Sequence, residues 1–261
     1  MRWFIVLVSC LLSVPALAAE VQERPELAKL LKDAGVTGVV AMLDPQSGTI
    51  SVSDRALAAR QSLPASTFKV PAALIALDTG VVKDAQGDVF KQDWPTSSIK
   101  ACNADQTLAT ALVRSCVPVF AKIGRMIGDE KLTDALTVFE YGNAKATGGY
   151  PYWLAGDLRI SPLEQIAFID KLRRQDLPVS QSAMNAVTEI IEIDRTDTYV
   201  LRGKTGWAGA KNPDTGWFVG WAEKGDDVRV FAVNIEMTDI ADAPKRLAIA
   251  KQMLDAASIK P

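Results

Sequence analysis

The pattern of apolar and polar positions begins with one helix and two strands. Residues 24–33 carry apolar side chains at helical spacing and end before Gly35, which predicts an amphipathic helix. Two runs typical of strands follow at 38–43 and 49–53, and the segment Asp-Pro-Gln-Ser-Gly between them favours a turn. This part of the chain therefore predicts two strands joined by a turn.

The middle of the chain is dominated by helical spacing. Residues 70–77 are apolar on every side and predict a buried helix, and residues 81–104 then look irregular. Helical periodicity continues from Asp105 to about residue 140, with breaks near Pro118 and Gly128.

Two further helices are predicted at 161–174 and 180–192. The first has Ser161 at the N-cap, Pro162 at the first helical position and Glu164 at the third, a combination typical of a helix start.

The last part of the chain changes to strand periodicity. Runs at 198–205, 216–221 and 228–234 predict three antiparallel strands, and residues 243–257 predict a final amphipathic helix. Strands, a helical middle and further strands together predict an α+β fold, with an antiparallel β-sheet flanked by helices and a mostly helical lobe.

The N-terminus has the pattern of a targeting signal. Arg2, an apolar run and the small-residue pattern Ala16-Leu17-Ala18 predict a signal peptide at 1–18. The remaining residues, 19–261, have the size of a single domain. No later stretch approaches the ~20 apolar residues of a membrane span, so we expect no membrane span and a periplasmic or secreted protein.

Composition limits the possible chemistry. The chain of 261 residues has a net charge of −2 and no basic run, so we expect no nucleic-acid partner. It contains no histidine, which excludes a Ser-His-Asp triad and histidine-liganded zinc, and we expect no metal site. An activated serine must use lysine, a carboxylate or tyrosine as its base.

Cys102 and Cys116 are the cysteines that remain after the predicted signal cleavage. In an oxidising compartment they could form a disulfide, and two buried free thiols are the alternative. The sequence does not determine the distance between them, so both alternatives stay open at this point.

The candidate chemistry begins at Ser66, three residues before Lys69. Residues three apart share a helix face, so the hydroxyl and the amine would lie side by side on the first turn of the buried helix. Backbone N–H groups of that turn suit a developing oxyanion. Apolar surroundings lower the pKa of a lysine, and a neutral amine, or a group made from it, could take the serine proton. A second Ser-x-x-Lys at 97–100 has no apolar helix behind it and is interpreted as surface.

Several downstream segments are ordinary when each is taken alone. Lys-Thr-Gly at 204–206 could bind a carboxylate, yet an isolated copy at a strand end is more often solvated. A helical serine such as Ser115 more often bonds to its own helix, and Tyr-Gly-Asn at 141–143 is a common turn. Trp153 and Trp217 would be core residues.

These motifs nevertheless occur together in one order, and the chain thereby resembles the class D, or OXA-type, serine β-lactamases. They are Ser66–Lys69, Ser115–Val117, Tyr141–Asn143, Trp153–Gly156 and Lys204–Gly206. Ser-x-x-Lys and Lys-Thr-Gly also occur in class A enzymes and penicillin-binding proteins, whereas Tyr-Gly-Asn and Trp-Leu-x-Gly point to class D. The resemblance runs from about residue 36 to the C-terminus. It implies a β-lactamase/penicillin-binding-protein transpeptidase-like fold, with 19–261 as a single catalytic domain that hydrolyses penicillin-type antibiotics.

The resemblance implies roles in catalysis for four side chains. Ser66 would form the acyl-enzyme, and Lys69 would be carboxylated by carbon dioxide or bicarbonate, with no other cofactor expected. The carbamate on Lys69 would be the general base for both acylation and deacylation. Trp153 would donate its indole N–H to that carbamate, and Ser115 would relay a proton to the β-lactam nitrogen.

The resemblance also implies which residues shape the pocket. The backbone N–H groups of Ser66 and Trp207 would form the oxyanion hole. Val117 and Leu154 would keep the surroundings of the lysine apolar. Gly206 would let the substrate pass close to the strand backbone.

The substrate carboxylate would be bound by Lys204, Thr205 and an arginine of the last helix. Arg246 is the residue that best matches the family's arginine, because a guanidinium binds a carboxylate with two parallel bonds. Lys245 is the alternative, because the sequence before Arg246 departs from the family's usual apolar lead-in.

Three other functions share these motifs. They are a β-lactam sensor that stays acylated, a D-Ala-D-Ala peptidase of the cell wall, and an inactive penicillin-binding relative. Trp153-Leu154 favours a hydrolase that deacylates. The sequence leaves open the substrate spectrum, the inhibitor profile and the oligomeric state.

Overall fold

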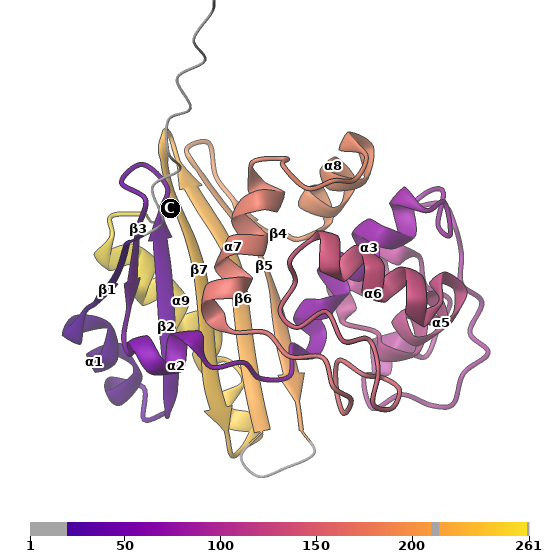
Figure 1. The fold of residues 1–261 in the computed structure, drawn as a ribbon, viewed down its shortest axis with the longest axis horizontal. Helices are drawn as coiled ribbons and strands as arrows, with labels where there is room; N and C mark the ends of the chain where they lie inside the picture. Colours follow the sequence, from indigo (N-terminus) through magenta and orange to yellow (C-terminus); the bar gives the residue numbers. More distant parts are fainter. Residues whose placement is uncertain (1–19, 210–213, 260) are drawn as a thin grey trace, which may run out of the picture.

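The computed structural model describes residues 20–209, 214–259 and 261. The predicted signal peptide at 1–18 lies outside the described residues. A β-sheet and a helical lobe lie side by side in the described chain (Figure 1), and this arrangement confirms the predicted α+β fold.

The sheet has seven strands in the described chain, in the order β1-β3-β2-β7-β6-β5-β4. Their bounds are β1 Glu20–Glu23, β2 Gly38–Asp44, β3 Thr49–Val52, β4 Glu192–Arg195, β5 Tyr199–Ala208, β6 Asp214–Lys224 and β7 Asp227–Met237. Neighbouring strands are antiparallel except β1 and β3, which are parallel. The sheet is therefore mixed, with one parallel pair at its edge.

The two edge strands are absent from the predicted elements. β1 has the sequence Glu-Val-Gln-Glu, which carries no alternating apolar pattern, and it is held by pairing with β3. β4 begins at Glu192, where helical periodicity predicted the end of a helix, and its register with β5 is interrupted by a bulge.

Helices cover both faces of the sheet. On one face, α1 (Pro25–Asp33) and α9 (Lys245–Ala256) bury Leu27, Leu31, Ile249 and Met253 against β2, β6 and β7. On the other face, α7 (Pro162–Arg173) packs on the same strands beside the short helix α2 (Arg55–Ala59), as Figure 1 shows. The predicted capping box of α7 is present: the Ser161 side chain accepts from the Glu164 N–H, and the Glu164 carboxylate accepts from the Ser161 N–H at 2.7 Å.

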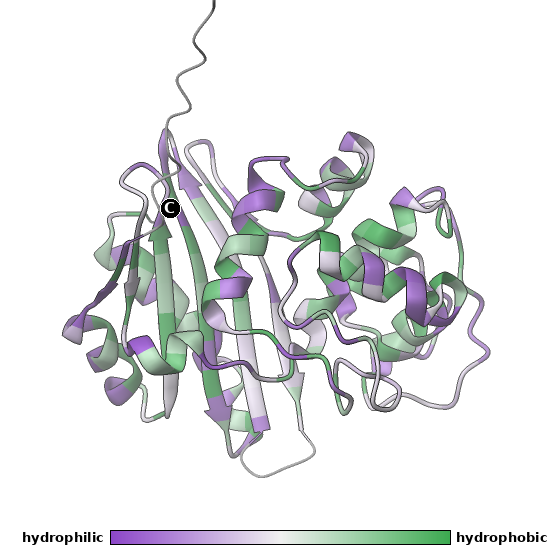
Figure 2. Ribbon diagram, in the orientation of Figure 1, coloured by the Kyte–Doolittle hydropathy of each residue, from purple (hydrophilic) through white to green (hydrophobic). Residues whose placement is uncertain are grey.

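The helical lobe is built around α3 (Lys69–Asp78), which follows a 3₁₀ turn, η1 (Ala65–Phe68). The helices that pack around it are α4 Leu108–Arg114, α5 Val117–Ile127, α6 Asp129–Val138 and α8 Gln181–Ile190. Figure 2 shows apolar residues along α3, and its residues from Lys69 to Ala76 are all buried. The break predicted near Pro118 lies two residues earlier, between α4 and α5.

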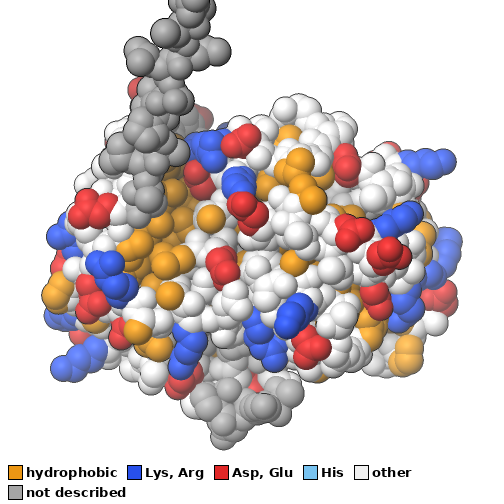
Figure 3. All heavy atoms as spheres, viewed as in Figure 1, with side chains coloured by type: hydrophobic (Ala, Val, Ile, Leu, Met, Phe, Trp, Pro, Cys, Tyr) orange, Lys and Arg blue, Asp and Glu red, His pale blue; other side chains and the backbone are white. Residues whose placement is uncertain are grey.

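The surface carries both signs of charge. On the face shown in Figure 3, lysine and arginine side chains are interspersed with aspartate and glutamate side chains. In the part of the chain that the structure describes, no helix has the length and apolar character needed to cross a membrane.

Two short 3₁₀ turns, η2 (Lys100–Cys102) and η3 (Ile240–Asp242), complete the elements.

Candidate active site

Ser66 and Lys69 are in direct contact at the entrance to α3. The Lys69 Nζ donates to Ser66 Oγ over 2.6 Å, and both side chains are buried. Ser66 lies on the 3₁₀ turn η1 instead of the first α-helical turn that its spacing predicted. In a 3₁₀ turn the side chains of residues i and i+3 eclipse each other, so this geometry brings the hydroxyl and the amine together directly.

The amine of Lys69 lies in apolar surroundings. Its Nζ is 5.6 Å from the ring centroid of Phe120 and 6.0 Å from that of Trp153, which stacks on Phe68. Burial holds the pKa of Lys69 well below its ordinary value of 10.5, and the positive charge of Lys204 lowers it further. The environment thus favours a neutral amine.

Trp153 presents an unsatisfied donor next to that amine. Its side chain is fully buried, and its indole Nε1 finds no hydrogen-bond partner among the described residues. An indole offers only one polar group, the N–H, and leaving it unpaired in the interior is unfavourable. A group on Lys69 that carries acceptor oxygens fits this position.

Ser115 and Lys204 form a second hydroxyl–lysine pair. The Lys204 Nζ, on β5, donates to Ser115 Oγ over 2.9 Å and to the Thr205 carbonyl over 2.9 Å. Burial first, and the charge of Arg246 second, lower the pKa of Lys204 from 10.5 to about 7. Near neutral pH this amine can therefore either hold or release a proton.

Gly206 brings β5 against the turn that carries Ser66. A Cβ at Gly206 would lie 3.2 Å from the Ser66 nitrogen, the Pro64 oxygen and the Ala65 Cβ. The turn is also held by a hydrogen bond of 2.9 Å from the Trp217 indole to the Leu63 carbonyl. A side chain at position 206 would push the strand and the turn apart, and this close packing explains the glycine at that position.

Arg246 and Lys245 have different partners. Lys245 forms an ion pair of 2.9 Å with Asp242. Arg246 is buried and donates to the carbonyl oxygens of Ala243 and Gly206, the latter on β5. Of these two candidates, Arg246 is therefore the one attached to the strand of the candidate site.

The remaining predicted residues line the same region. Thr205 and Trp207 are exposed on one side of β5, and the Trp207 indole donates to Asp214 over 2.9 Å. Val117, at the start of α5, and Leu154, next to Trp153, are half-buried and pack against the core of the lobe. Lys100 of the second Ser-x-x-Lys copy is exposed, as its polar surroundings predicted.

A small cavity of about 120 Å³ adjoins Lys204 and Thr205, lined also by Leu112, Val113 and Ile191. A larger one of about 550 Å³ lies between α3 and α8, lined by Leu77 and Ala183 among others. Neither cavity is lined by Ser66 or Lys69, so the candidate site is defined by the two hydroxyl–lysine pairs and not by a cavity. Among the described residues, no group of three or more Cys, Asp or Glu side chains converges as a metal site.

A polar network behind Ser66 is absent from the predicted site. Gln165, a buried residue of α7, donates to Thr67 Oγ1 over 2.7 Å, and Thr67 Oγ1 donates to the Pro64 carbonyl over 2.6 Å. Tyr141 of the Tyr-Gly-Asn motif lies 3.4 Å from the same hydroxyl. A glutamine at a buried helical position is the signal that could have identified this network.

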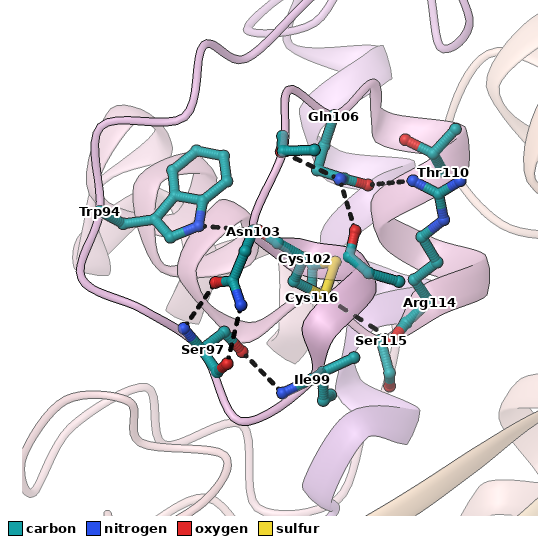
Figure 4. Close-up of a disulfide and its surroundings, with 12 residues drawn as sticks. Trp94, Ser97, Ile99, Cys102, Asn103, Gln106, Thr110, Arg114, Ser115 and Cys116 are labelled. Carbon is teal, nitrogen blue, oxygen red and sulfur yellow. Dashed lines mark hydrogen bonds between the residues drawn. A yellow bond between two sulfur atoms is a disulfide. The ribbon is translucent and has the colours of Figure 1, made fainter.

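Cys102 and Cys116 form a disulfide, which settles the alternative that the sequence left open. Figure 4 shows the bond linking η2 to the junction of α4 and α5, next to Ser115. Both cysteines are fully buried.

The penicillin binding protein transpeptidase domain family matches residues 32–255. The chain is 37% identical to "Beta-lactamase OXA-48" of Klebsiella pneumoniae over 258 residues, which covers 98% of this chain and 97% of that protein. It is 35% identical to "Beta-lactamase OXA-10" of Pseudomonas aeruginosa over 258 residues, covering 97% and 96%.

Two solved structures are similar along nearly their whole length. The class D β-lactamase YbXI from Nostoc has a TM-score of 0.85 and 33% identity, covering 90% of this chain and 99% of that chain. FUS-1 (OXA-85), a class D β-lactamase from Fusobacterium nucleatum, has a TM-score of 0.88 and 29% identity, covering 92% and 100%.

Proposed function

The chain belongs to the penicillin-binding transpeptidase domain family and, within it, to the class D β-lactamases, and we propose that it hydrolyses penicillin-type antibiotics through an acyl-enzyme on Ser66. The observation that carries the proposal is the contact of 2.6 Å between the Ser66 hydroxyl and a buried lysine amine of lowered pKa. In a chain without histidine, this pair supplies both a nucleophile and a route for its proton.

In acylation, Ser66 Oγ attacks the carbonyl carbon of the β-lactam while its proton passes to the base at Lys69. The carbonyl oxygen becomes an oxyanion, which the backbone N–H groups of Ser66 and Trp207 would bind. The close approach of Gly206 to the Ser66 nitrogen supports this pairing of donors.

Collapse of the oxyanion breaks the C–N bond of the ring. The nitrogen takes a proton from Ser115 Oγ, and Ser115 is reprotonated from Lys204, to which it is hydrogen-bonded over 2.9 Å. The pKa of Lys204, about 7, suits a group that gives and regains a proton near neutral pH. The base at Lys69 then releases the proton taken from Ser66 to solvent, and Lys204 regains one from solvent. In deacylation the base accepts a proton from the attacking water and returns it to Ser66 Oγ as the ester bond breaks.

Lys69 is the residue we propose to be carboxylated by carbon dioxide. Only a neutral amine reacts with carbon dioxide, and burial lowers the pKa of Lys69 in that direction. Trp153 would hold the resulting group with its free indole N–H, and Val117 and Leu154 would keep water away from it. The group would supply a carboxylate base for both acylation and deacylation.

Substrate would bind along β5. In the described chain, β5 pairs with β4 only at residues 200–202, so from Lys204 onward its outer edge has no strand partner and an amide of the substrate can add there. Thr205 and Arg246, with Lys204, would bind the carboxylate of the antibiotic. The ion pair of Lys245 with Asp242 favours Arg246 as the arginine concerned.

The proposal includes export to the periplasm or the exterior, where these antibiotics act, through cleavage of residues 1–18. N-terminal sequencing of the protein from the periplasmic fraction would test this part. A first residue other than Ala19 would contradict the assigned cleavage site.

Intact-protein mass spectrometry during a penicillin reaction, with and without added bicarbonate, tests the function. We expect a transient adduct, accumulating product and a faster rate with bicarbonate, and no adduct in the Ser66→Ala variant. A persistent adduct that bicarbonate does not affect would instead identify a sensor or a penicillin-binding peptidase.

A further inference from the structure

The junction between α4 and α5 consists of only two residues, Ser115 and Cys116. Ser115 has φ 63° and ψ 35°, in the left-handed region that usually requires glycine. Its hydroxyl lies 2.9 Å from Lys204 Nζ in this conformation. A residue with a side chain remains in this region only where its surroundings determine it.

The backbone bonds of the junction are those of a helix end. The Cys116 N–H donates to the Ala111 carbonyl over 2.9 Å, and the Ser115 N–H reaches the Leu112 carbonyl at 3.3 Å. The second of these is long, so the backbone alone holds Ser115 weakly. The disulfide from Cys116 adds a covalent connection directly after Ser115.

The other end of the disulfide is firmly attached. The Cys102 N–H donates to the Ile99 carbonyl over 2.9 Å, and the Trp94 indole donates to the Cys102 carbonyl over 2.9 Å. Gln106 donates to the Ala101 carbonyl over 2.9 Å. In Figure 4, Trp94, Ile99 and Gln106 lie around Cys102, and Ser115 lies beyond the two sulfur atoms with its side chain directed away from them.

We propose that the Cys102–Cys116 disulfide positions Ser115 for proton transfer, by holding the junction so that the Ser115 hydroxyl stays against Lys204. The inference rests on the proposed role of Ser115 in acylation. Without the covalent bond, Ser115 can relax to the right-handed conformation favoured by residues with a Cβ, and its hydroxyl then leaves Lys204. The cysteines are positioning residues, because they act through Ser115.

The test compares the protein with the Cys102→Ala/Cys116→Ala variant in single-turnover acylation by a chromogenic cephalosporin. Rapid quenching and intact mass give the rate constant of acylation and the fraction of enzyme that acylates. We expect acylation to be roughly tenfold to hundredfold slower in the variant, since a small misplacement of a reacting group has effects of this size. The acylating fraction and the deacylation rate constant should be unchanged.

A second pair of proteins shows whether the effect passes through Ser115. In a Ser115→Ala background, removal of the two cysteines should slow acylation no further, because the hydroxyl they position is already absent. Reduction of the disulfide with a phosphine can be monitored by mass spectrometry as a gain of two hydrogens. It should slow acylation, and reoxidation should restore the acylation rate. The double alanine variant should not respond to the phosphine.

Three results would overturn the inference. They are unchanged acylation in the double variant, a smaller acylating fraction with an unchanged rate constant, and slowing that adds to the effect of Ser115→Ala. The second would mean that the disulfide only maintains the folded population. If Ser115→Ala itself leaves acylation unchanged, the proposed role of Ser115 is wrong, which is a separate outcome.

Discussion

Replacing Lys204 by methionine should stabilise the fold near neutral pH, and this gain should shrink as the pH rises. Lys204 is 5% exposed and forms no ion pair among the described residues. Its pKa is lowered from 10.5 to about 7, mainly because burial disfavours the charged form. Folding near neutral pH thus places an amine in surroundings that oppose its protonation.

The size and sign follow from proton linkage. Between pH 7 and 10.5 the unfolded chain binds the proton of this lysine while the folded chain does not, so the free energy of unfolding rises with pH in that window. The difference of about 3.5 between the two pKa values corresponds to about 5 kcal/mol, an order-of-magnitude figure. Below pH 7 this destabilisation is fully present, and above 10.5 it is absent.

The assay is urea denaturation of the protein and of Lys204→Met at several pH values from 6 to 9.5, in buffer depleted of carbon dioxide. The variant should be the more stable protein at pH 6, and its advantage should fall by about 3 kcal/mol by pH 9.5. Taking the difference between the two proteins cancels the contribution of the tyrosines to the pH dependence. Their raised pKa values affect stability only above this pH range. Lys251→Met, which removes an exposed lysine of α9, controls for the change in net charge.

A constant difference between the two proteins across this pH range would refute the reasoning. A fixed offset can arise from packing of the methionine or from the lost hydrogen bond to Ser115, neither of which titrates. Only the slope reports titration of buried amines, which are Lys204 and also Lys69, because the charge of Lys204 lowers the pKa of Lys69. A flat comparison would therefore show that Lys204 keeps its proton in the folded protein throughout the range.

Three further predictions concern turnover. Lys69→Ala should lower the rate of penicillin hydrolysis by about 10²- to 10⁴-fold, and unimpaired hydrolysis in a steady-state assay would exclude Lys69 as the base. Trp153→Phe keeps the stacking on Phe68 but removes the indole N–H, so deacylation should slow more than acylation and the acyl-enzyme should accumulate in mass spectra; normal turnover without a trapped adduct would make the indole structural. Arg246→Ala should raise KM about tenfold for substrates with a free carboxylate, and an equal rise for an esterified analogue would remove Arg246 from carboxylate binding.

The local elements were largely predictable from the sequence, and the exceptions have physical reasons. The helix after Ser161 follows from its capping box, and the strands β5, β6 and β7 follow from their runs of strand-forming residues. β1 was missed because its four residues, Glu-Val-Gln-Glu, have no periodicity of their own and are ordered by pairing with β3. The turn of Ser66 is a 3₁₀ turn because β5 and Trp217 hold it from outside the segment.

The candidate site was predictable where its residues are close together in the sequence. Ser66 and Lys69 are three residues apart at the start of an apolar helix, so their spacing and setting predicted the contact. Ser115 and Lys204 are 89 residues apart, and only the resemblance to class D β-lactamases connected them before the fold was known. The disulfide stayed open because a separation of 14 residues does not determine a distance.

The buried basic groups also affect how the site binds its substrate. Three basic side chains, Lys69, Lys204 and Arg246, are buried at the site, and burial lowers the pKa of each. None of them has a carboxylate partner among the described residues. Unpaired buried charge is destabilising, and an anion that enters the site relieves it. Penicillins carry a carboxylate, and carboxylation of Lys69 adds a second negative charge, so each would compensate part of this charge. We infer that the uncompensated charge of Lys204 and Arg246 lowers the stability of the free enzyme and favours an anionic ligand. Removal of Lys204 should therefore raise stability while it weakens substrate binding.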